Sequence, residues 1–263
     1  MSFDPAQFAQ SALSAGSQQG WESYRLCKIG EWERPWFQRR TGKTDAPALY
    51  ISAGIHGDEP AGSYAALELL RHPEIFHGLD VTLFPMLNPA GLAANTRENA
   101  AGIDLNRDYR DPKSEEIRSH LATLQTLGQY TMTLCLHEDW EMTGFYFYEL
   151  NVSGEPACGL EIQRAMAEHL PIETRAVIDD FEAKNGIIAR NAELLRLPRP
   201  QWPEAFYLSH YHTQLGYTFE TPSKAAPLES RVAAHVAGVR AAAHFARTQR
   251  LVPPRGTMPS LSQ

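Results

Sequence analysis

Largely apolar runs of a few residues recur along the chain, and each is followed by a longer stretch in which apolar and polar positions mix. Short apolar runs are typical of strands buried on both faces, and the mixed stretches have the spacing of amphipathic helices. Strands are expected at residues 48–53, 81–86, 131–137, 145–148 and 217–221. Helices are expected at residues 4–15, 62–71, 114–127, 155–170 and 228–250.

The alternation of strands and helices predicts an α/β fold with a mixed, largely parallel central sheet and helices on both faces. Residues 24–40 alternate well enough to add an opening pair of strands, and residues 209–213 are expected to form a loop. Because no internal repeat or linker is visible, residues 1–263 are expected to form a single catalytic domain with a core of about residues 21–250. The Pro- and Ser-rich residues 252–263 are expected to be a loose tail.

The composition narrows the range of partners. A formal net charge of −7 without any cluster of Lys and Arg argues against a nucleic-acid surface, which depends on concentrated positive charge. The first 20 residues lack the basic start and apolar centre of a secretion signal, and no apolar run approaches a membrane span. We therefore expect a cytoplasmic protein that acts on small molecules or peptides, with no membrane partner and with its oligomeric state left open.

A glycine-flanked His-x-x-Glu motif follows the first central strand. His56 and Glu59 lie at the expected strand-to-helix turn, where an imidazole nitrogen and a carboxylate oxygen can bind one cation. Gly54 and Gly57 favour this interpretation because glycines let the backbone approach a ligand closely. The alternative is an ordinary turn in which the acidic residues only cap the next helix.

A third ligand is needed, and His137 is the best candidate. It follows the apolar run 131–136 and would lie at the carboxyl end of a buried strand, where the active sites of α/β proteins gather. A histidine at a strand end can also be a packing residue. The adjacent Glu138 and Asp139 make an acidic cluster that is unusual for a structural position, and they raise the further hypothesis of a second metal.

Two further groups of polar residues complete a candidate site. Asn106 and Arg107 offer donors that match a carboxylate, although they could be an ordinary solvated pair, and Asp104 could orient a ligating imidazole. Glu220 is the candidate general base. Burial beside Phe219 would raise the pKa of Glu220 toward the range useful for proton transfer; the alternative is an exposed carboxylate at a sheet edge.

The remaining histidines carry weaker signals. His210 and His212 could bind a metal, but they lie in the expected loop without an acidic motif. The others are expected to pack or to face solvent: His72, His77, His120, His169, His235 and His244.

In their order along the chain, these motifs resemble those of the zinc carboxypeptidase family. The resemblance also includes Asn88-Pro89-Ala90-Gly91 and residues 95–107, and it extends over about residues 48–250. Within the family, the chain is most similar to the compact bacterial branch that includes the murein peptide amidases. One family element is not placed by spacing, the tyrosine that closes over the substrate, for which the candidates are Tyr207, Tyr211 and Tyr217.

The resemblance implies a role for each candidate residue. One Zn²⁺ per chain would be bound by His56, Glu59 and His137, with Asp104 as the partner of His56. The substrate carboxylate would be bound by Asn106 and Arg107, Arg97 would polarise the reacting carbonyl, and Glu220 would be the general base.

The expected activity is that of a zinc-dependent metallocarboxypeptidase or peptide amidase, which hydrolyses the amide bond next to a C-terminal carboxylate-bearing residue of short peptides. The alternative is an N-acyl-amino-acid deacylase of the aspartoacylase and succinylglutamate desuccinylase type, which shares the ligand pair and the Asn-Arg element. Those enzymes usually append a β-rich domain, whereas a helix and a tail are expected after Glu220. A third reading is a non-catalytic binding protein, which would lack a ligand or the base, and none is missing.

Overall fold

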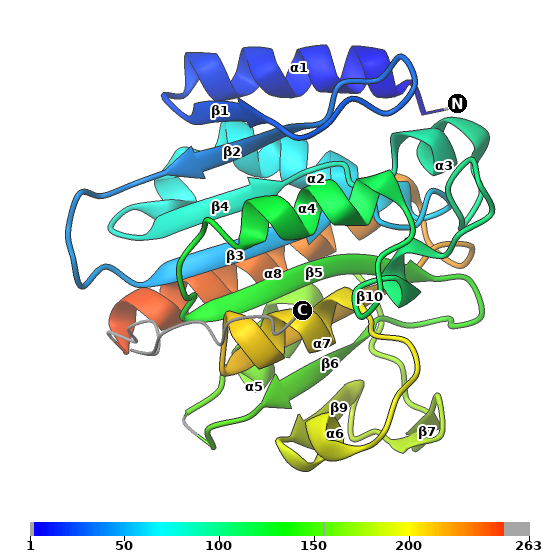
Figure 1. The fold of residues 1–263 in the computed structure, drawn as a ribbon. Helices are drawn as coiled ribbons and strands as arrows, with labels where there is room; N and C mark the ends of the chain where they lie inside the picture. The colour runs from blue at the N-terminus through cyan, green and yellow to red at the C-terminus, as the bar shows by residue number, and fades with distance from the viewer. Residues whose placement is uncertain (1–2, 155, 250–263) are drawn as a thin grey trace.

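The computed structural model describes residues 3–154 and 156–249, and its central feature is a mixed eight-stranded sheet (Figure 1). The strand order is β1-β2-β4-β3-β5-β10-β6-β9. The strands are β1 (Glu22–Arg25), β2 (Pro35–Arg39), β3 (Ala48–Ala53), β4 (Asp80–Phe84), β5 (Met132–Asp139), β6 (Tyr146–Asn151), β9 (Ile187–Asn191) and β10 (Leu215–Pro222). Strands β4, β3, β5 and β10 run parallel, whereas β2 and β6 pair antiparallel with β4 and β10. The predicted sheet type is confirmed.

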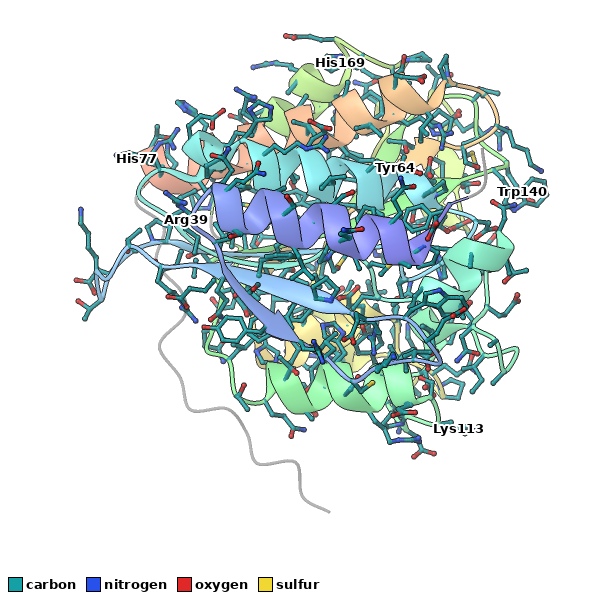
Figure 2. All side chains as sticks on the ribbon, turned by 90° about the horizontal axis from the view of Figure 1, so that it is seen from above. Arg39, Tyr64, His77, Lys113, Trp140 and His169 are labelled. Carbon is teal, nitrogen blue, oxygen red and sulfur yellow. The ribbon has the colours of Figure 1, made fainter. Side chains whose placement is uncertain are left out.

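Helices cover both faces of this sheet, as predicted. One face carries α1 (Pro5–Gln18), α2 (Pro60–Arg71), α5 (Gly159–Met166) and α8 (Leu228–Thr248). The other face carries α4 (Glu115–Leu124) and α7 (Glu204–Tyr211). Viewed from above, α1, α2 and α8 lie in one layer and α4 lies on the opposite side (Figure 2). Short elements occupy the connections: α3 (Pro89–Ala94), α6 (Glu193–Arg196), β7 (Val177–Ile178), β8 (Phe181–Glu182), η1 (Pro73–Phe76) and η2 (Leu105–Arg107).

Each face of the sheet has its own apolar cluster. Strand β3 is buried along its whole length because successive side chains point to opposite faces. Leu49 and Ile51 belong to the cluster under α2 and α8, and Tyr50 belongs to the cluster under α4 and α7. This double burial explains why the sequence shows an apolar run instead of an alternating pattern.

Several predicted boundaries were wrong. Strand β5 does not end at His137 but continues to Asp139, and the helix expected at residues 155–170 is shortened to α5. The loop expected at residues 209–213 is partly helical, because Phe206 and Leu208 of α7 are buried against the sheet and carry the helix to Tyr211. The predicted loose tail, residues 252–263, lies outside the described residues.

The histidines outside the candidate site behave as predicted. His120 and His235 are fully buried, and His72, His77, His169 and His244 are exposed. Figure 2 shows His77 and His169 at the surface. None of the helices within residues 3–154 and 156–249 has the length and apolarity needed to cross a membrane.

Candidate active site

The His-x-x-Glu motif lies on the tight turn between β3 and α2. Gly54 adopts a φ of +65°, which favours glycine. Gly57 packs so closely on the first turn of α3 that a Cβ atom there would lie 1.8 Å from the carbonyl carbon of Gly91. Asn88 joins the two segments by donating its Nδ2 to the carbonyl of Ile55, at 3.2 Å. The turn is therefore fixed from both sides, and so are the two candidate ligands that it carries.

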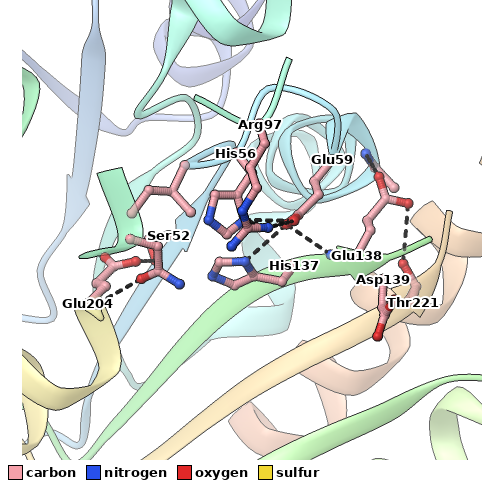
Figure 3. Close-up of polar contacts among 12 residues, drawn as sticks. Ser52, His56, Glu59, Arg97, His137, Glu138, Asp139, Glu204 and Thr221 are labelled. Carbon is pink, nitrogen blue, oxygen red and sulfur yellow. Dashed lines mark hydrogen bonds and ion pairs between the residues drawn. The ribbon is translucent and has the colours of Figure 1, made fainter. Parts of the chain in front are cut away.

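His56, Glu59 and His137 converge on one point (Figure 3). The Nδ1 atom of His56 lies 2.6 Å from Oε1 of Glu59, and the Nδ1 atom of His137 lies 3.0 Å from Oε2 of the same carboxylate. All three side chains are buried. Across the described ranges, this is the one group whose potential ligand atoms lie close enough together, within 4.8 Å, to hold a metal ion. Two imidazole nitrogens and a carboxylate are a common donor set for catalytic zinc.

Asp104 and Arg97 surround this group. Oδ1 of Asp104 lies 3.2 Å from Nε2 of His56, so the other imidazole nitrogen, Nδ1, is the one turned toward Glu59. Arg97 donates its Nε to Oδ2 of Asp104 at 3.1 Å, and its Nη1 lies 3.4 Å from Oε1 of Glu59. Asp104 thus orients both a candidate ligand and the guanidinium beside it.

The charges of these groups are strongly coupled. Burial alone would raise the pKa of Glu59, but the neighbouring imidazoles hold it well below its usual range. The pKa of Asp104 is also lowered against the effect of burial, chiefly by His56. Burial lowers the pKa of His137, whereas Glu59 and Asp104 overcome burial at His56 and raise its pKa to about 9. Both carboxylates are therefore ionised at neutral pH, the form that binds a cation.

The ligand group opens into a cavity of about 680 Å³. Arg97, Asn106, Arg107 and Glu220 line the same cavity, whereas Asp104 does not. Asn106 accepts the backbone N–H of Glu204 with its Oδ1 at 2.8 Å, so its Nδ2 is the part of the amide left to donate to a ligand. The structure thus brings seven of the eight candidate residues together around one cavity. The eighth, Asp104, contacts His56 and Arg97.

Glu220 lies on β10 beside His137 of β5, and the two are partners in the parallel register. Its side chain is half-buried. Burial raises the pKa of Glu220 well above its usual value, and the charges of Glu59 and Asp139 add to the shift. The direction and its cause, burial, agree with the sequence prediction, but Phe219 does not provide the burial. Phe219 points to the other face, where it packs against α8 close to Gly238.

The acidic pair after His137 divides between the two faces of the sheet. Glu138 lies on the face covered by α2 and α8. It accepts the backbone N–H of Ala61 at 2.8 Å and forms an ion pair with Arg231. Asp139 faces the cavity and accepts the hydroxyl of Tyr146 at 2.9 Å. Figure 3 shows Glu138 directed away from the histidines. Neither belongs to a metal-binding group in the described part of the chain, so nothing here supports the second metal.

The pair His210 and His212 does not converge. The ring of His210 stacks on Trp202, with centroids 4.3 Å apart, and its Nδ1 lies 2.8 Å from the carbonyl of Phe206. His212 is buried, and its Nδ1 lies 3.2 Å from the carbonyl of Gly128. The helix that replaces the expected loop therefore turns the two imidazoles to different partners, and both serve packing.

Comparison with known sequences points to the same region. Residues 45–146 match the model of the succinylglutamate desuccinylase/aspartoacylase catalytic domain, a stretch that contains the three candidate ligands but ends before Glu220. Over 84 residues the chain is 34% identical to carboxypeptidase SOL1 from Arabidopsis thaliana. The aligned region covers 27% of this chain and 17% of that protein. The chain therefore spans less than a fifth of the curated relative that it matches.

Solved structures share the fold over almost the whole chain. A candidate metallopeptidase from Shewanella amazonensis has a TM-score of 0.77 at 25% identity, with 94% of this chain and 93% of that chain covered. A metallo-carboxypeptidase from Pseudomonas aeruginosa, in complex with (2-guanidinoethylmercapto)succinic acid, has a TM-score of 0.64 at 17% identity, with 92% and 68% covered. The chain is therefore similar to carboxypeptidase-like metallohydrolases in its fold and, over residues 45–146, in its sequence.

The tyrosines at the cavity are not the ones considered from the sequence. Tyr146 and Tyr148 line the cavity, whereas Tyr207, Tyr211 and Tyr217 do not. Tyr217 faces away and donates to Oε2 of Glu149 at 3.0 Å. Burial raises the pKa of the Tyr146 and Tyr148 hydroxyls, so both remain protonated donors. Their alternate positions in the run 145–148 were the available signal, because alternate residues of a strand share a face.

Proposed function

We propose that the chain is a zinc-dependent hydrolase that cleaves the amide bond next to a C-terminal carboxylate-bearing residue of short peptides. The observation that carries the proposal is the convergence of a two-histidine, one-carboxylate group with a raised-pKa glutamate and two carboxylate-matching side chains in one cavity. Metal-binding groups alone are compatible with many chemistries. The additional presence of Glu220, Asn106 and Arg107 in the same space favours amide hydrolysis of an anionic substrate.

The residues present fit zinc. Both Nδ1 atoms of the histidines lie against one carboxylate, and Asp104 engages the remaining nitrogen of His56, which is the usual arrangement behind a ligating imidazole. His56, Glu59 and His137 would hold the ion, and the cavity leaves a side open for water and substrate. When bound, zinc acts as a Lewis acid that lowers the pKa of water and polarises a carbonyl.

The chain's own residues would supply the remaining steps. The Glu220 carboxylate accepts a proton from the attacking water and returns it to the nitrogen of the leaving amine. The guanidinium of Arg97 donates to the negative charge that develops on the carbonyl oxygen. Nδ2 of Asn106 and the fork of Arg107 bind the substrate carboxylate and thereby set which bond lies near Glu220.

A second candidate is an N-acyl-amino-acid deacylase, which the match of residues 45–146 favours. Both activities hydrolyse an amide next to a carboxylate, and they differ in the acyl group that is removed. A single catalytic domain and a cytoplasmic location are further parts of the proposal that rest on the sequence.

The decisive experiment measures amino-acid release by mass spectrometry from two pools, short peptides and N-acyl amino acids. The zinc-loaded protein should release amino acid, and Glu220→Gln should lower turnover by about 10²–10⁴-fold while the zinc content stays unchanged. The matched control is Glu229→Gln, an exposed residue of α8 that does not line the cavity.

Each outcome has a defined meaning. Release from the peptide pool supports the proposal, and release from the N-acyl pool alone moves it to the deacylase. Equal turnover in Glu220→Gln and the parent protein removes Glu220 from the proton-transfer role. No release from either pool by the zinc-loaded protein contradicts the proposed hydrolase.

A further inference from the structure

The far end of the active-site cavity carries two arginines that form no ion pair in the described part of the chain. Arg190 of β9 and Arg199, which precedes α7, both line the cavity. The guanidinium of Arg190 lies over the ring of Phe181, at 4.5 Å from the centroid, and that of Arg199 lies over Phe206, at 4.6 Å. Nε of Arg190 is shielded from solvent and has no hydrogen-bond partner within the described ranges. A buried donor without a partner is uncommon in native structures.

The sheet register fixes where Arg190 lies relative to the candidate ligands. Residues that face the cavity form rows across the strands. The first row is His137, Glu220 and Tyr146, the second is Cys135, Thr218 and Tyr148, and the third is Gly216, Leu150 and Arg190. Each row is two residues further along the strands, so the third row lies about 13 Å from the first. Arg190 therefore marks the end of the cavity opposite the metal group.

The cavity between these ends suits a long side chain. Gly216 in the third row has no side chain to fill the space, and a Cβ there would lie 2.9 Å from Oγ1 of Thr133. The end wall is apolar and consists of Leu150, Leu194 and Phe206, which form one cluster. The flat faces of both guanidiniums stack on aromatic rings, so a ligand that reaches this wall would contact their N–H groups. Stacked arginines keep their fork of donors available for a carboxylate.

The charge along the cavity is uneven. Near the metal group the cavity carries both signs of charge, with Glu59, Asp139 and Glu220 beside Arg97 and Arg107. The far end has the two arginines Arg190 and Arg199. Asp179 lies between these two ends, where it accepts the hydroxyl of Tyr148 at 2.5 Å and pairs with neither arginine in the described part of the chain. A neutral or basic side chain would leave both guanidiniums desolvated without a counter-charge, whereas an anionic one would neutralise them.

We infer that Arg190, assisted by Arg199, selects substrates whose leaving amino acid has a long side chain that ends in a carboxylate, of glutamate length or greater. The inference rests on the proposed function, because it specifies the amino acid on the amine side of the cleaved amide. Asn106 and Arg107 bind the main-chain carboxylate, and Arg190 binds the second one. The favoured substrates are then amides of dicarboxylic amino acids.

The test compares N-acetyl-alanyl peptides that end in glutamate, glutamine or 2-aminoadipate. Glutamate and glutamine differ in charge but hardly in shape. The zinc-loaded protein should cleave the glutamate and 2-aminoadipate peptides with a kcat/KM about 10- to 100-fold above that of the glutamine peptide, through KM. Arg190→Gln should collapse this ratio toward one, Arg190→Lys should restore part of it, and Arg199→Gln should reduce it.

The matched control is Arg196→Gln, an exposed residue of α6 that does not line the cavity and should leave the ratio as in the parent protein. Zinc content and thermal midpoint are measured for every variant. A merely structural Arg190 would lower the midpoint without changing the ratio, and that result overturns the inference. A parent protein that cleaves the glutamine peptide as well as the glutamate peptide also overturns it and leaves the proposed hydrolase intact.

If none of these peptides is cleaved, binding decides the inference, and the two substrate pools described above decide the proposed function. Calorimetric titration of the zinc-loaded protein with N-acetylglutamate and N-acetylglutamine then gives the same comparison without turnover. Preferential binding of N-acetylglutamate that Arg190→Gln abolishes supports the selective role of Arg190. Equal binding of the two compounds overturns it.

Discussion

At the scale of single residues, Glu204 is the most consequential side chain that the sequence did not reveal. It is 1% exposed, yet its carboxylate accepts the hydroxyl of Tyr50 and, at 3.0 Å, that of Ser52. Its backbone N–H is the donor that orients Asn106. Burial raises the pKa of Glu204 to about 7, although the hydrogen bonds from Tyr50 and Ser52 oppose the shift. Glu204 therefore connects Asn106 to β3 and is partly protonated near neutral pH.

This raised pKa predicts how the free energy of unfolding depends on pH. Between about pH 4.5 and pH 7 the folded chain keeps a proton on Glu204 that the unfolded chain has released. The folded state binds more protons, so the contribution of Glu204 to stability falls as pH rises through this window and is level above it. A shift of this size corresponds to about 3 kcal/mol.

Urea denaturation of the parent protein and Glu204→Gln at a series of pH values measures this contribution. The difference in the free energy of unfolding, parent minus variant, should decrease from pH 4.5 to pH 7. Glu229→Gln serves as the control for loss of a surface carboxylate. A difference that stays constant or increases with pH would contradict the raised pKa of Glu204.

The sequence located residues whose chemistry follows from local spacing and missed those that depend on register. His56 and Glu59 share one turn, and His137 follows an apolar run, so the pattern alone brings all three to attention. Arg190 and Glu204 lie in a part of the chain without apolar periodicity. Arg190 reaches the cavity only because β9 pairs with β6, and Glu204 reaches Asn106 only because α7 packs on the sheet. No local pattern encodes those contacts.

At the scale of elements, the contact between the β3–α2 turn and α3 sets the geometry of the candidate ligands. A Cβ atom at Gly57 would overlap the backbone of Gly91, and a backbone cannot rotate away as a side chain can. Gly57→Ala should therefore displace the turn that carries His56 and Glu59. Overpacking of this kind costs about 1–3 kcal/mol, and we expect zinc affinity to fall by at least about 10-fold because ligand geometry is lost.

Competition against a chromophoric chelator measures the zinc affinity, and thermal denaturation measures the stability. Gly128→Ala is the matched control, because no atom lies within 4 Å of the Cβ position there and the backbone is not in the left-handed region. The control should keep the zinc affinity of the parent protein. Parental affinity in Gly57→Ala would show that the turn tolerates the displacement.

The elements that the sequence predicted well are those with a long apolar signal. Strand β3 was predicted at its observed bounds because both of its faces are buried, and α8 was predicted to within two residues because its apolar positions recur over many turns. Strands β7, β8 and β9 and helix α6 were not predicted. They are short, and contacts rather than their own composition hold them. Strand β9 pairs with β6, β7 and β8 pair with each other, and the hydroxyl of Tyr148 donates to Asp179 between them.

At the scale of the whole molecule, the site joins parts of the chain that fold from distant segments. Strands β3, β5 and β10 are neighbours in the sheet, and their carboxyl ends deliver the turn with His56 and Glu59, then His137, then Glu220. Ligands at the carboxyl ends of parallel strands are a general property of open α/β sheets. Because two of these strands supply the metal group, a bound ion would act as a bridge between them.

Metal binding should therefore stabilise the fold as a whole. An ion that binds only the folded chain adds about 2.7 kcal/mol to the free energy of unfolding at a concentration 100 times its Kd. For a chain of this length the corresponding rise in Tm is about 5–10 °C.

Calorimetry before and after chelator treatment should show a fall in Tm of this size and its recovery on adding zinc. In Glu59→Gln, which removes the carboxylate shared by both histidines, neither chelator nor zinc should shift Tm. An equal shift in that variant would place the stabilising ion elsewhere in the molecule, because the bridge between β3 and β5 depends on this carboxylate.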